Sequence, residues 1–166
     1  MERRRGCGFV LLVLVLLAIC AGVVIAAALF LAGEPNEIRT SATTSADVIP
    51  LGEQFTVTVN VENVDLEAVR ITAIGLSRDI LDGASVAATD PPVATVQERD
   101  LYVLGAWQQY PINQLLLGGT STEFTFTLTA ARPGAYSGDV TVWVENDILG
   151  VAFERARRER VEFEVH

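Results

Sequence analysis

The hydrophobic positions of this chain follow two different patterns, one before and one after residue 33. Residues Phe9 to Ala32 form a run without a single charged side chain. A helix needs about 20 predominantly apolar residues to cross a hydrocarbon core about 30 Å thick, and at about 1.5 Å per residue this run reaches roughly 36 Å. The pattern therefore predicts a transmembrane α-helix over residues 9–32.

After a short linker at residues 33–36, apolar and polar side chains alternate with a period of two. Phe55, Val57, Val59 and Val61 share one face of such a segment, and threonine, asparagine and glutamate occupy the other. This alternation is typical of a strand with one buried face. The predicted strands cover residues 37–44, 53–63, 67–78, 94–104, 122–130, 136–146 and 151–165.

Turn residues separate these segments, and there is almost no helical periodicity. Pro50-Leu51-Gly52 and Pro133-Gly134 are examples, since proline and glycine favour turns. Residues 105–121 are the least regular part and are predicted to form a long loop. Together these features predict an all-β fold, an antiparallel β-sandwich of about seven strands over residues 37–166.

Charged residues flank the apolar run unequally. Arginines occupy positions 3–5 before it, whereas Glu34 and Glu37 follow it. Because basic residues favour the cytoplasmic side of a membrane, residues 1–8 are predicted to form a cytoplasmic basic tail. The chain is then a single-pass protein of the cell membrane, with a signal-anchor and an extracytoplasmic C-terminal domain.

Two other interpretations of the N-terminal run stay open. A cleaved signal peptide also begins with basic residues, although its apolar core is usually only about 7–15 residues long. The Gly8-Phe9 junction resembles a type IV prepilin cleavage site, which would make the chain a pilin-like or structural assembly subunit. That family places a glutamate at the fifth mature position, where this chain has Val13.

Small side chains recur every four residues within the run. Ala18, Gly22 and Ala26 therefore share one helix face, and small-residue seams let two membrane helices approach closely. This pattern predicts a surface for homodimerisation through the transmembrane helix. The alternative is that alanine and glycine are simply common in membrane helices.

The chain is acidic, with a net charge of −9, and the part after Ala32 is more acidic still because the arginines at positions 3–5 precede it. Such a charge repels nucleic acid, so no nucleic-acid partner is expected. Both cysteines, Cys7 and Cys20, lie before residue 33. No disulfide can therefore form within the C-terminal domain, whose stability must come from its core.

The side chains that hydrolytic and zinc-dependent chemistry needs are scarce. The single histidine is His166, the last residue, so nucleophilic triads and zinc sites are not expected. We therefore predict no enzyme activity, no catalytic residues and no cofactor. Calcium, which takes carboxylate and carbonyl oxygens as ligands, is the alternative. Its candidate turns are Glu62-Asn63-Val64-Asp65, Asp79 with Asp82, and Glu145-Asn146-Asp147.

One segment sharpens the fold prediction. Arg132-Pro133-Gly134-Ala135-Tyr136-Ser137-Gly138 resembles the tyrosine corner of immunoglobulin-like domains, in which Gly-x-Tyr opens strand F. The strand from Gly52 to Asn63 is similar to one that recurs in bacterial Ig-like domains of the CARDB and adhesion type. The resemblance covers about residues 36–166 and implies an Ig-like sandwich, but it implies no activity.

Four aromatic side chains are candidate contacts for a partner. Tyr102, Trp107 and Tyr110 belong to an amide-rich, irregular part of the chain, and Trp143 alternates with the valines of a predicted strand. Exposed tyrosine and tryptophan suit contacts with sugars or proteins. The alternative is that Trp107 folds back over the open end of the core, since large aromatic side chains are mostly buried.

The last predicted hairpin holds candidate membrane contacts. In an Ig topology its loop lies at the same end as the N-terminus of the domain, which the anchor tethers to the bilayer, and arginines attract anionic headgroups. The alternative is that the arginines pair with neighbouring glutamates on a solvated strand. The candidates are Ile148, Leu149, Phe153, Arg155, Arg157, Arg158 and Arg160.

The predicted function is non-catalytic binding by a membrane-anchored extracytoplasmic domain, in adhesion, ligand capture or as an accessory subunit of an envelope complex. The partner is predicted to be an unidentified envelope protein or a glycan. A pilin-like subunit is the alternative, and a carbohydrate-active enzyme or sugar-binding module is a distant third.

Overall fold

The computed structural model describes residues 13–23, 33–101, 105–148 and 151–166. The chain divides into two compact units, Met1–Gly33 and Glu34–His166. In the first unit residues 13–23 are helical. Among the described residues no helix is both long and apolar enough to cross a membrane. Much of the predicted transmembrane segment, residues 9–12 and 24–32, lies outside the described residues.

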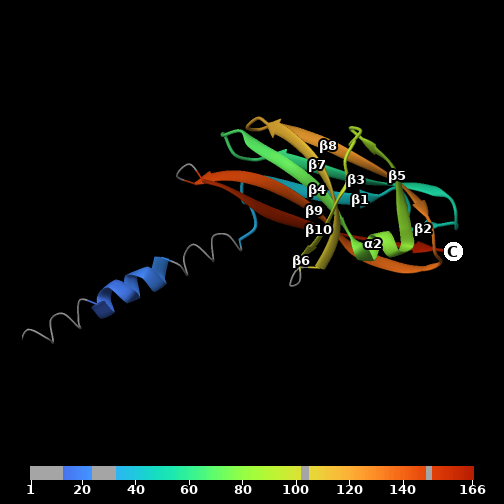
Figure 1. The fold of residues 1–166 in the computed structure, drawn as a ribbon. Helices are drawn as coiled ribbons and strands as arrows, with labels where there is room; N and C mark the ends of the chain where they lie inside the picture. The colour runs from blue at the N-terminus through green and yellow to red at the C-terminus, as the bar shows by residue number, and fades with distance from the viewer. Residues whose placement is uncertain (1–12, 24–32, 102–104, 149–150) are drawn as a thin grey trace, which may run out of the picture. The chain divides into compact units, whose positions relative to one another are not determined.

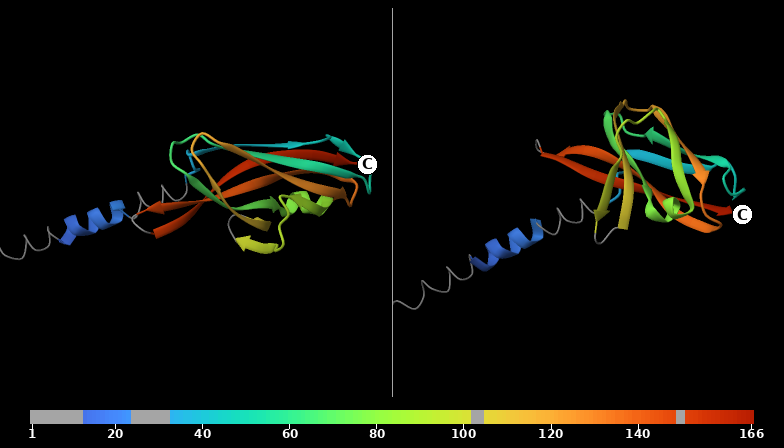
Figure 2. Two further views of the ribbon diagram at one scale, coloured as in Figure 1. Left: turned by 90° about the horizontal axis from the view of Figure 1, so that it is seen from above. Right: turned by 45° about the vertical axis from the view of Figure 1, so that its right-hand side comes forward.

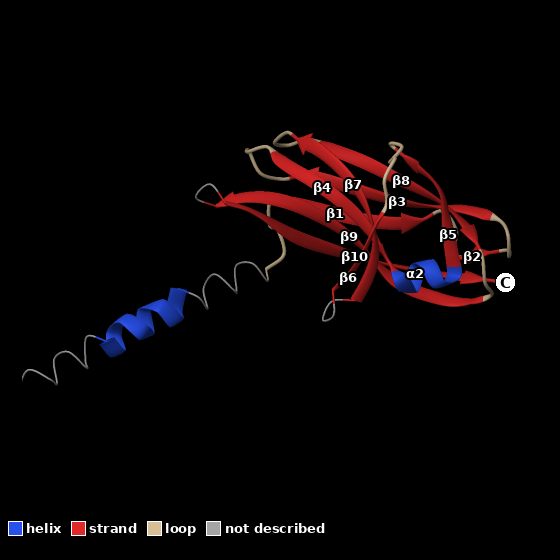
Figure 3. Cartoon of the chain, in the orientation of Figure 1, coloured by secondary structure: helices blue, strands red, loops and turns tan. Residues whose placement is uncertain are grey.

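The second unit consists of two β-sheets packed face to face (Figures 1 and 3). One sheet has the strand order β1-β3-β8-β5, and the other has the order β2-β10-β9-β4-β7-β6. All pairs are antiparallel except β2 with β10, so the predicted antiparallel β-sandwich is confirmed. The elements are β1 (Ile38–Thr44), β2 (Val48–Ile49), β3 (Gln54–Asn63), β4 (Val69–Ser77), α2 (Arg78–Gly83), β5 (Ala84–Asp90), β6 (Gln97–Leu101), β7 (Gly105–Leu116), β8 (Ser121–Ala130), β9 (Gly134–Ile148) and β10 (Val151–Val165).

The strand positions match those of an Ig-like sandwich, but one connection differs. In a variable-type Ig domain the extra strands C′ and C″ belong to the sheet of strands G, F and C, and D lies in the other sheet. Here β4 leads through α2 to β5 at the edge of the opposite sheet, and the chain then returns to form the β6–β7 hairpin beside β4. Two consecutive strands, β5 and β6, therefore form edges of different sheets.

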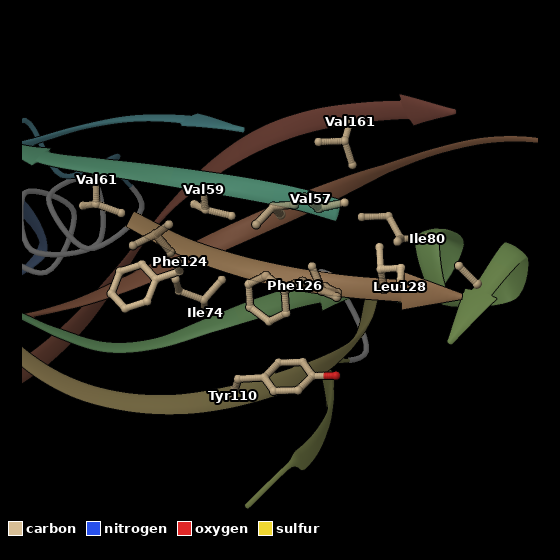
Figure 4. Packing of buried hydrophobic residues seen from close by; sticks show 14 of the residues in the cluster. Val57, Val59, Val61, Ile74, Ile80, Tyr110, Phe124, Phe126, Leu128 and Val161 are labelled. Atoms are coloured by element: carbon tan, nitrogen blue, oxygen red, sulfur yellow. The ribbon is translucent and has the colours of Figure 1, made fainter. Parts of the chain in front are cut away.

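The core lies between the sheets and uses the inward positions of the alternating pattern (Figure 4). Val57, Val59 and Val61 of β3 are fully buried, and Phe124 and Phe126 of β8 are 1% exposed. Burying side chains of this size stabilises a fold by about 1.5–3 kcal/mol each before the entropy of ordering is subtracted. A core of this kind can stabilise the sandwich without a disulfide.

Tyr136 forms the predicted tyrosine corner at the start of β9. Its hydroxyl lies 3.1 Å from the carbonyl oxygen of Arg132 and 3.3 Å from that of Pro133. Its ring stacks on Phe163 of β10 with the ring centroids 5.4 Å apart. Gly134 begins the strand with φ of +147°, a conformation that a β-carbon disfavours. The motif thereby fixes the turn that leads from β8 into β9.

Two expectations about secondary structure are wrong. Residues 105–121 are not a long loop, because most of them form β7, which pairs with β4. The described strands number ten rather than about seven. β2 is only two residues long, and β5 is built largely from small and polar residues. Neither has enough alternation to be recognised from the sequence.

Candidate functional site

A groove of about 600 Å³ lies between α2, β5 and the β6–β7 hairpin. Figure 2 shows α2 next to this hairpin. Apolar side chains contribute to its lining, and charged groups of both signs surround them. The polar residues that line it are Arg78, Asp82, Ser85, Glu98, Arg99 and Gln108.

Two glycines let α2 pack closely on β9 and so position one wall of the groove. A β-carbon on Gly138 would lie 2.8 Å from Ile80 Cγ1 of α2 and 2.4 Å from Ser77 Oγ directly before it, and one on Gly83 would lie 2.4 Å from the Tyr136 ring. Ser77 Oγ also accepts a hydrogen bond of 3.0 Å from the Asp139 amide. Real β-carbons do not fit at such distances, so these two positions require glycine if the helix is to stay where it is.

Two edge strands border the groove. In the described sheets β5 pairs with β8 alone, and β6 pairs with β7 alone. The outward backbone N–H and C=O groups of an edge strand can pair with a further strand. An extended peptide could therefore bind here by adding a strand to either sheet.

The two faces of the β6–β7 hairpin carry different chemistry. Glu98 is opposite Gln108, and Arg99 is opposite Trp107, so the two pairs point to opposite faces. The Tyr110 hydroxyl donates a hydrogen bond of 2.7 Å to Gln108 Oε1. Burial raises the pKa of Tyr110 from 10.0 to about 12, so this hydroxyl keeps its proton, and its bond to Gln108, at a higher pH than an exposed tyrosine would.

A pair of tryptophans covers part of the outer face of the larger sheet. Trp107 and Trp143 pack edge to face with ring centroids 6.1 Å apart. The guanidinium carbon of Arg158 lies 5.3 Å from the centroid of the Trp107 ring, which is a cation–π contact. The Trp143 ring lies over Gly75, where a β-carbon would be 2.5 Å from it. Both tryptophans are buried, at 5% and 6% exposure.

Three buried polar atoms in this part of the sheet have no hydrogen-bond partner among the described residues. They are Trp107 Nε1, Gln109 Oε1 and Thr141 Oγ1. Gln109 and Thr141 are the two cross-strand neighbours of Gly75. Buried polar atoms without a protein partner are usually hydrogen-bonded to ordered water. The region beneath the two tryptophan rings therefore contains polar groups as well as apolar ones.

The prediction of exposed aromatic side chains is wrong for the three that the structure describes. Tyr110 is 2% exposed, and its ring contacts Phe126 in the core at a centroid distance of 5.1 Å. Trp107 is buried, as the alternative interpretation held, but it covers Trp143 rather than the open end of the core. Each ring is buried because it has an aromatic neighbour. Tyr102 lies outside the described residues.

Arg155 is held inside the domain rather than presented to lipid. It is 6% exposed, lies 3.1 Å from the Glu37 carboxylate and donates a hydrogen bond to the Glu34 carbonyl. This corrects its prediction as a headgroup contact, because its charge is already paired. The same contacts join β10 to the segment by which the chain enters the second unit.

The other three arginines of β10 also have partners within the domain, and two of them pair with neighbouring glutamates, which is the alternative that the sequence left open. They are Arg157, which lies 3.7 Å from Glu159, Arg160, which lies 3.3 Å from Glu162, and Arg158, which lies over Trp107. Arg160 is 67% exposed and Arg157 is 29% exposed.

The remaining candidates are only partly described. Leu149, Ala26 and the side chain of Ile148 lie outside the described residues. Phe153 is half-buried on β10, and Ala18 and Gly22 are exposed on the helix at residues 13–23.

The first calcium candidate has a structural role. Asn63 is fully buried, and its amide donates hydrogen bonds to the carbonyls of Glu67 and Leu116 at 2.8 and 3.0 Å. Its Oδ1 accepts a hydrogen bond from the Asp65 amide at 3.0 Å. In the part of the chain that the structure describes, no group of three or more His, Cys, Asp or Glu side chains is placed to hold a metal ion.

Sequence reasoning missed the groove because no motif marks it. It depends on α2 and β5, which the sequence did not predict, and on the strand β7 in place of a loop. The only available signal was Gly138, at the position where an antibody domain has a cysteine, because a glycine there indicates a close approach by another element.

No protein-family profile matches the chain, and neither does any curated protein. Among solved structures, it is similar to the CARDB domain of the PF1109 protein from Pyrococcus furiosus, in complex with di-metal ions, with 14% identity over 78% of this chain and 87% of that one and a TM-score of 0.47. It is also similar to the cupredoxin domain of amoB from Nitrosocaldus yellowstonii, with 11% identity, coverage of 80% and 88% and a TM-score of 0.48.

A third similar structure is the cohesin module of a family 33 glycoside hydrolase from Clostridium perfringens ATCC13124, with 10% identity, coverage of 79% and 98% and a TM-score of 0.48. Identities this low assign no function to the chain.

Proposed function

We propose that the protein is a single-pass membrane protein whose extracytoplasmic β-sandwich, a bacterial Ig-like domain of the CARDB or adhesion type, binds another envelope protein without catalysing a reaction. The uncharged run at residues 9–32 supports the anchor. The arginines at positions 3–5 support a cytoplasmic N-terminus.

The observation that carries the binding function is the groove between the two edge strands. The outward backbone N–H and C=O groups of β5 and β6 can form hydrogen bonds with the backbone of an extended peptide. Arg78, Asp82 and Glu98 line the groove together with Arg99, which also pairs with Glu154 at 3.2 Å. Charges of both signs suit a peptide with mixed side chains better than a polyanion. The partner is therefore a protein segment in extended conformation.

The anchor is tested with the full chain expressed in a bacterium. It is expected to stay in the membrane after carbonate extraction, to lose its C-terminal domain to protease added outside the membrane, and to keep its original N-terminus. Release by carbonate contradicts the anchor. A mature N-terminus at Phe9 instead supports the pilin-like subunit.

The binding function is tested by photo-crosslinking in the same membranes. A benzoylphenylalanine at Ser85, which lines the groove, is expected to produce a crosslinked species with a second protein. The same substitution at Ser121, exposed at the start of β8, is the matched control and is expected to produce none. Equal crosslinking at both positions, or none at either, contradicts binding in the groove.

A further inference from the structure

Four large apolar side chains are exposed on two neighbouring connections of the sandwich, the β3–β4 loop and the end of β7 with the loop that follows it. Leu66 is 96% exposed and Val64 46%, both in the loop between β3 and β4. Leu115, near the end of β7, is 52% exposed, and Leu117, directly after it, is 60% exposed. Single exposed leucines are normal on a protein surface, but several together mark an interaction site.

The two loops form one surface. A β-carbon on Gly118 would lie 2.3 Å from the Leu66 carbonyl oxygen, so the loops touch through their backbones. The Gly119 amide donates a hydrogen bond of 3.0 Å to the Asn63 carbonyl, and the Asn63 amide donates one of 2.9 Å to Thr120. Backbone hydrogen bonds therefore hold together the two segments that carry the exposed leucines.

This surface lies where the chain enters the sandwich. The Val64 amide donates a hydrogen bond of 2.9 Å to the carbonyl of Glu37, and Figure 1 shows both loops at the end of the sandwich that residue 37 enters. Four residues lie between Ala32 and Glu37, and the five steps from one to the other span at most about 18 Å. A bilayer that holds residues 9–32 is therefore within about that distance of Glu37, to which the Val64 amide is hydrogen-bonded.

The charges around the leucines indicate the kind of lipid. Asp65 and Glu67 flank Leu66, and both line a depression with Leu115, Glu37 and Glu145. One basic residue, Arg70, also lines it and lies 3.8 Å from the Glu145 carboxylate, so carboxylates outnumber basic groups there. An anionic surface repels carboxylates, whereas a leaflet of zwitterionic headgroups carries no net charge and does not.

We propose that Val64, Leu66, Leu115 and Leu117 form a lipid-contact surface, which inserts into the headgroup region of a zwitterionic leaflet. The inference rests on the proposed function, since it needs the anchor at residues 9–32. The membrane contact would then be made by these apolar side chains and not by the arginines of β10. The opposite end of the sandwich would face away from the bilayer. Because the anchor already holds the domain at the membrane, inserting its apolar side chains costs less translational entropy than binding from solution does.

The test uses the full chain with Cys7→Ala and Cys20→Ala, reconstituted in phosphatidylcholine–phosphatidylethanolamine vesicles. Leu66→Cys and Leu117→Cys variants carry an environment-sensitive fluorophore. Leu51→Cys is the matched control, because Leu51 is 51% exposed in the turn between β2 and β3. With brominated lipids, the labels at positions 66 and 117 are expected to lose more than about half of their emission, as side chains inserted about 5–10 Å deep should. The label at position 51 is expected to keep its emission.

Anionic phosphatidylglycerol in the vesicles is expected to reduce the quenching at position 66, because Asp65 and Glu67 are then repelled. If the chain stays with carbonate-washed vesicles but labels 66 and 117 behave like label 51, the lipid contact is overturned while the anchor stands. Energy transfer between labelled copies without lipid quenching also overturns it and assigns the surface to a second copy. Release of the chain by carbonate overturns both proposals.

Discussion

At the scale of single residues, missing β-carbons decide where the rings of this protein can lie. Gly75 lets the Trp143 ring lie against β4, and Gly83 lets the Tyr136 ring lie against α2. Both rings were visible in the sequence, but their positions were not, because each depends on a glycine far away along the chain. Hydrogen bonds between single side chains also fix positions, as the bond from the Tyr110 hydroxyl to Gln108 does.

Gly75→Ala is expected to lower the free energy of unfolding by about 1–3 kcal/mol, because the added carbon overlaps the Trp143 ring. The measurement is urea unfolding of the full chain in detergent micelles, followed by circular dichroism. In a Trp143→Leu background the same substitution should have a smaller effect. An equal loss in both backgrounds would show that the ring is not the cause.

The pH dependence of stability is expected to report the burial of Tyr110. Its pKa is about 12 in the folded state and 10.0 when exposed. The unfolded chain therefore releases this proton first as the pH rises. The contribution to stability is complete below pH 10 and is lost between pH 10 and 12, by up to about 2–3 kcal/mol. Tyr110→Phe should flatten this part of the curve, and an unchanged curve in that variant would rule the explanation out.

At the scale of elements, β10 connects parts of the domain that are distant in sequence. It pairs with all of β9 and with β2, and its Arg155 holds Glu34 and Glu37 before β1. The alternation of β10 was sufficient to predict the strand. It did not distinguish the buried arginine from the exposed ones, since that depends on which carboxylate the fold brings opposite each of them.

Arg155→Met is expected to destabilise the domain by about 2–4 kcal/mol, because the carboxylate of Glu37 loses a buried partner. Arg160→Met is the matched control on the same strand. Its pair with Glu162 is exposed, so the change should be at most about 1 kcal/mol. Thermal unfolding of both variants beside the parent chain gives the comparison, and equal shifts would contradict a special role of Arg155.

At the scale of the whole molecule, the order of connections creates the surface that we propose for binding. Because β5 precedes the β6–β7 hairpin, the edges of both sheets border one groove. The exposed leucines lie at the end where the chain enters. The crosslinking experiment at Ser85 and the lipid-quenching experiment at Leu66 therefore test different regions of one domain.

The sequence by itself determined the sandwich and its tyrosine corner, because alternation and turn residues are local signals that the core reinforces. It predicted strands close to β1, β3, β4, β6, β8, β9 and β10 for this reason. The tertiary structure decided what local patterns do not contain. It placed Trp107 over Trp143, paired Arg155 with Glu37, turned an expected loop into β7, and formed the groove. Each of these depends on contacts between residues distant in the chain, whose partners only the packed fold selects.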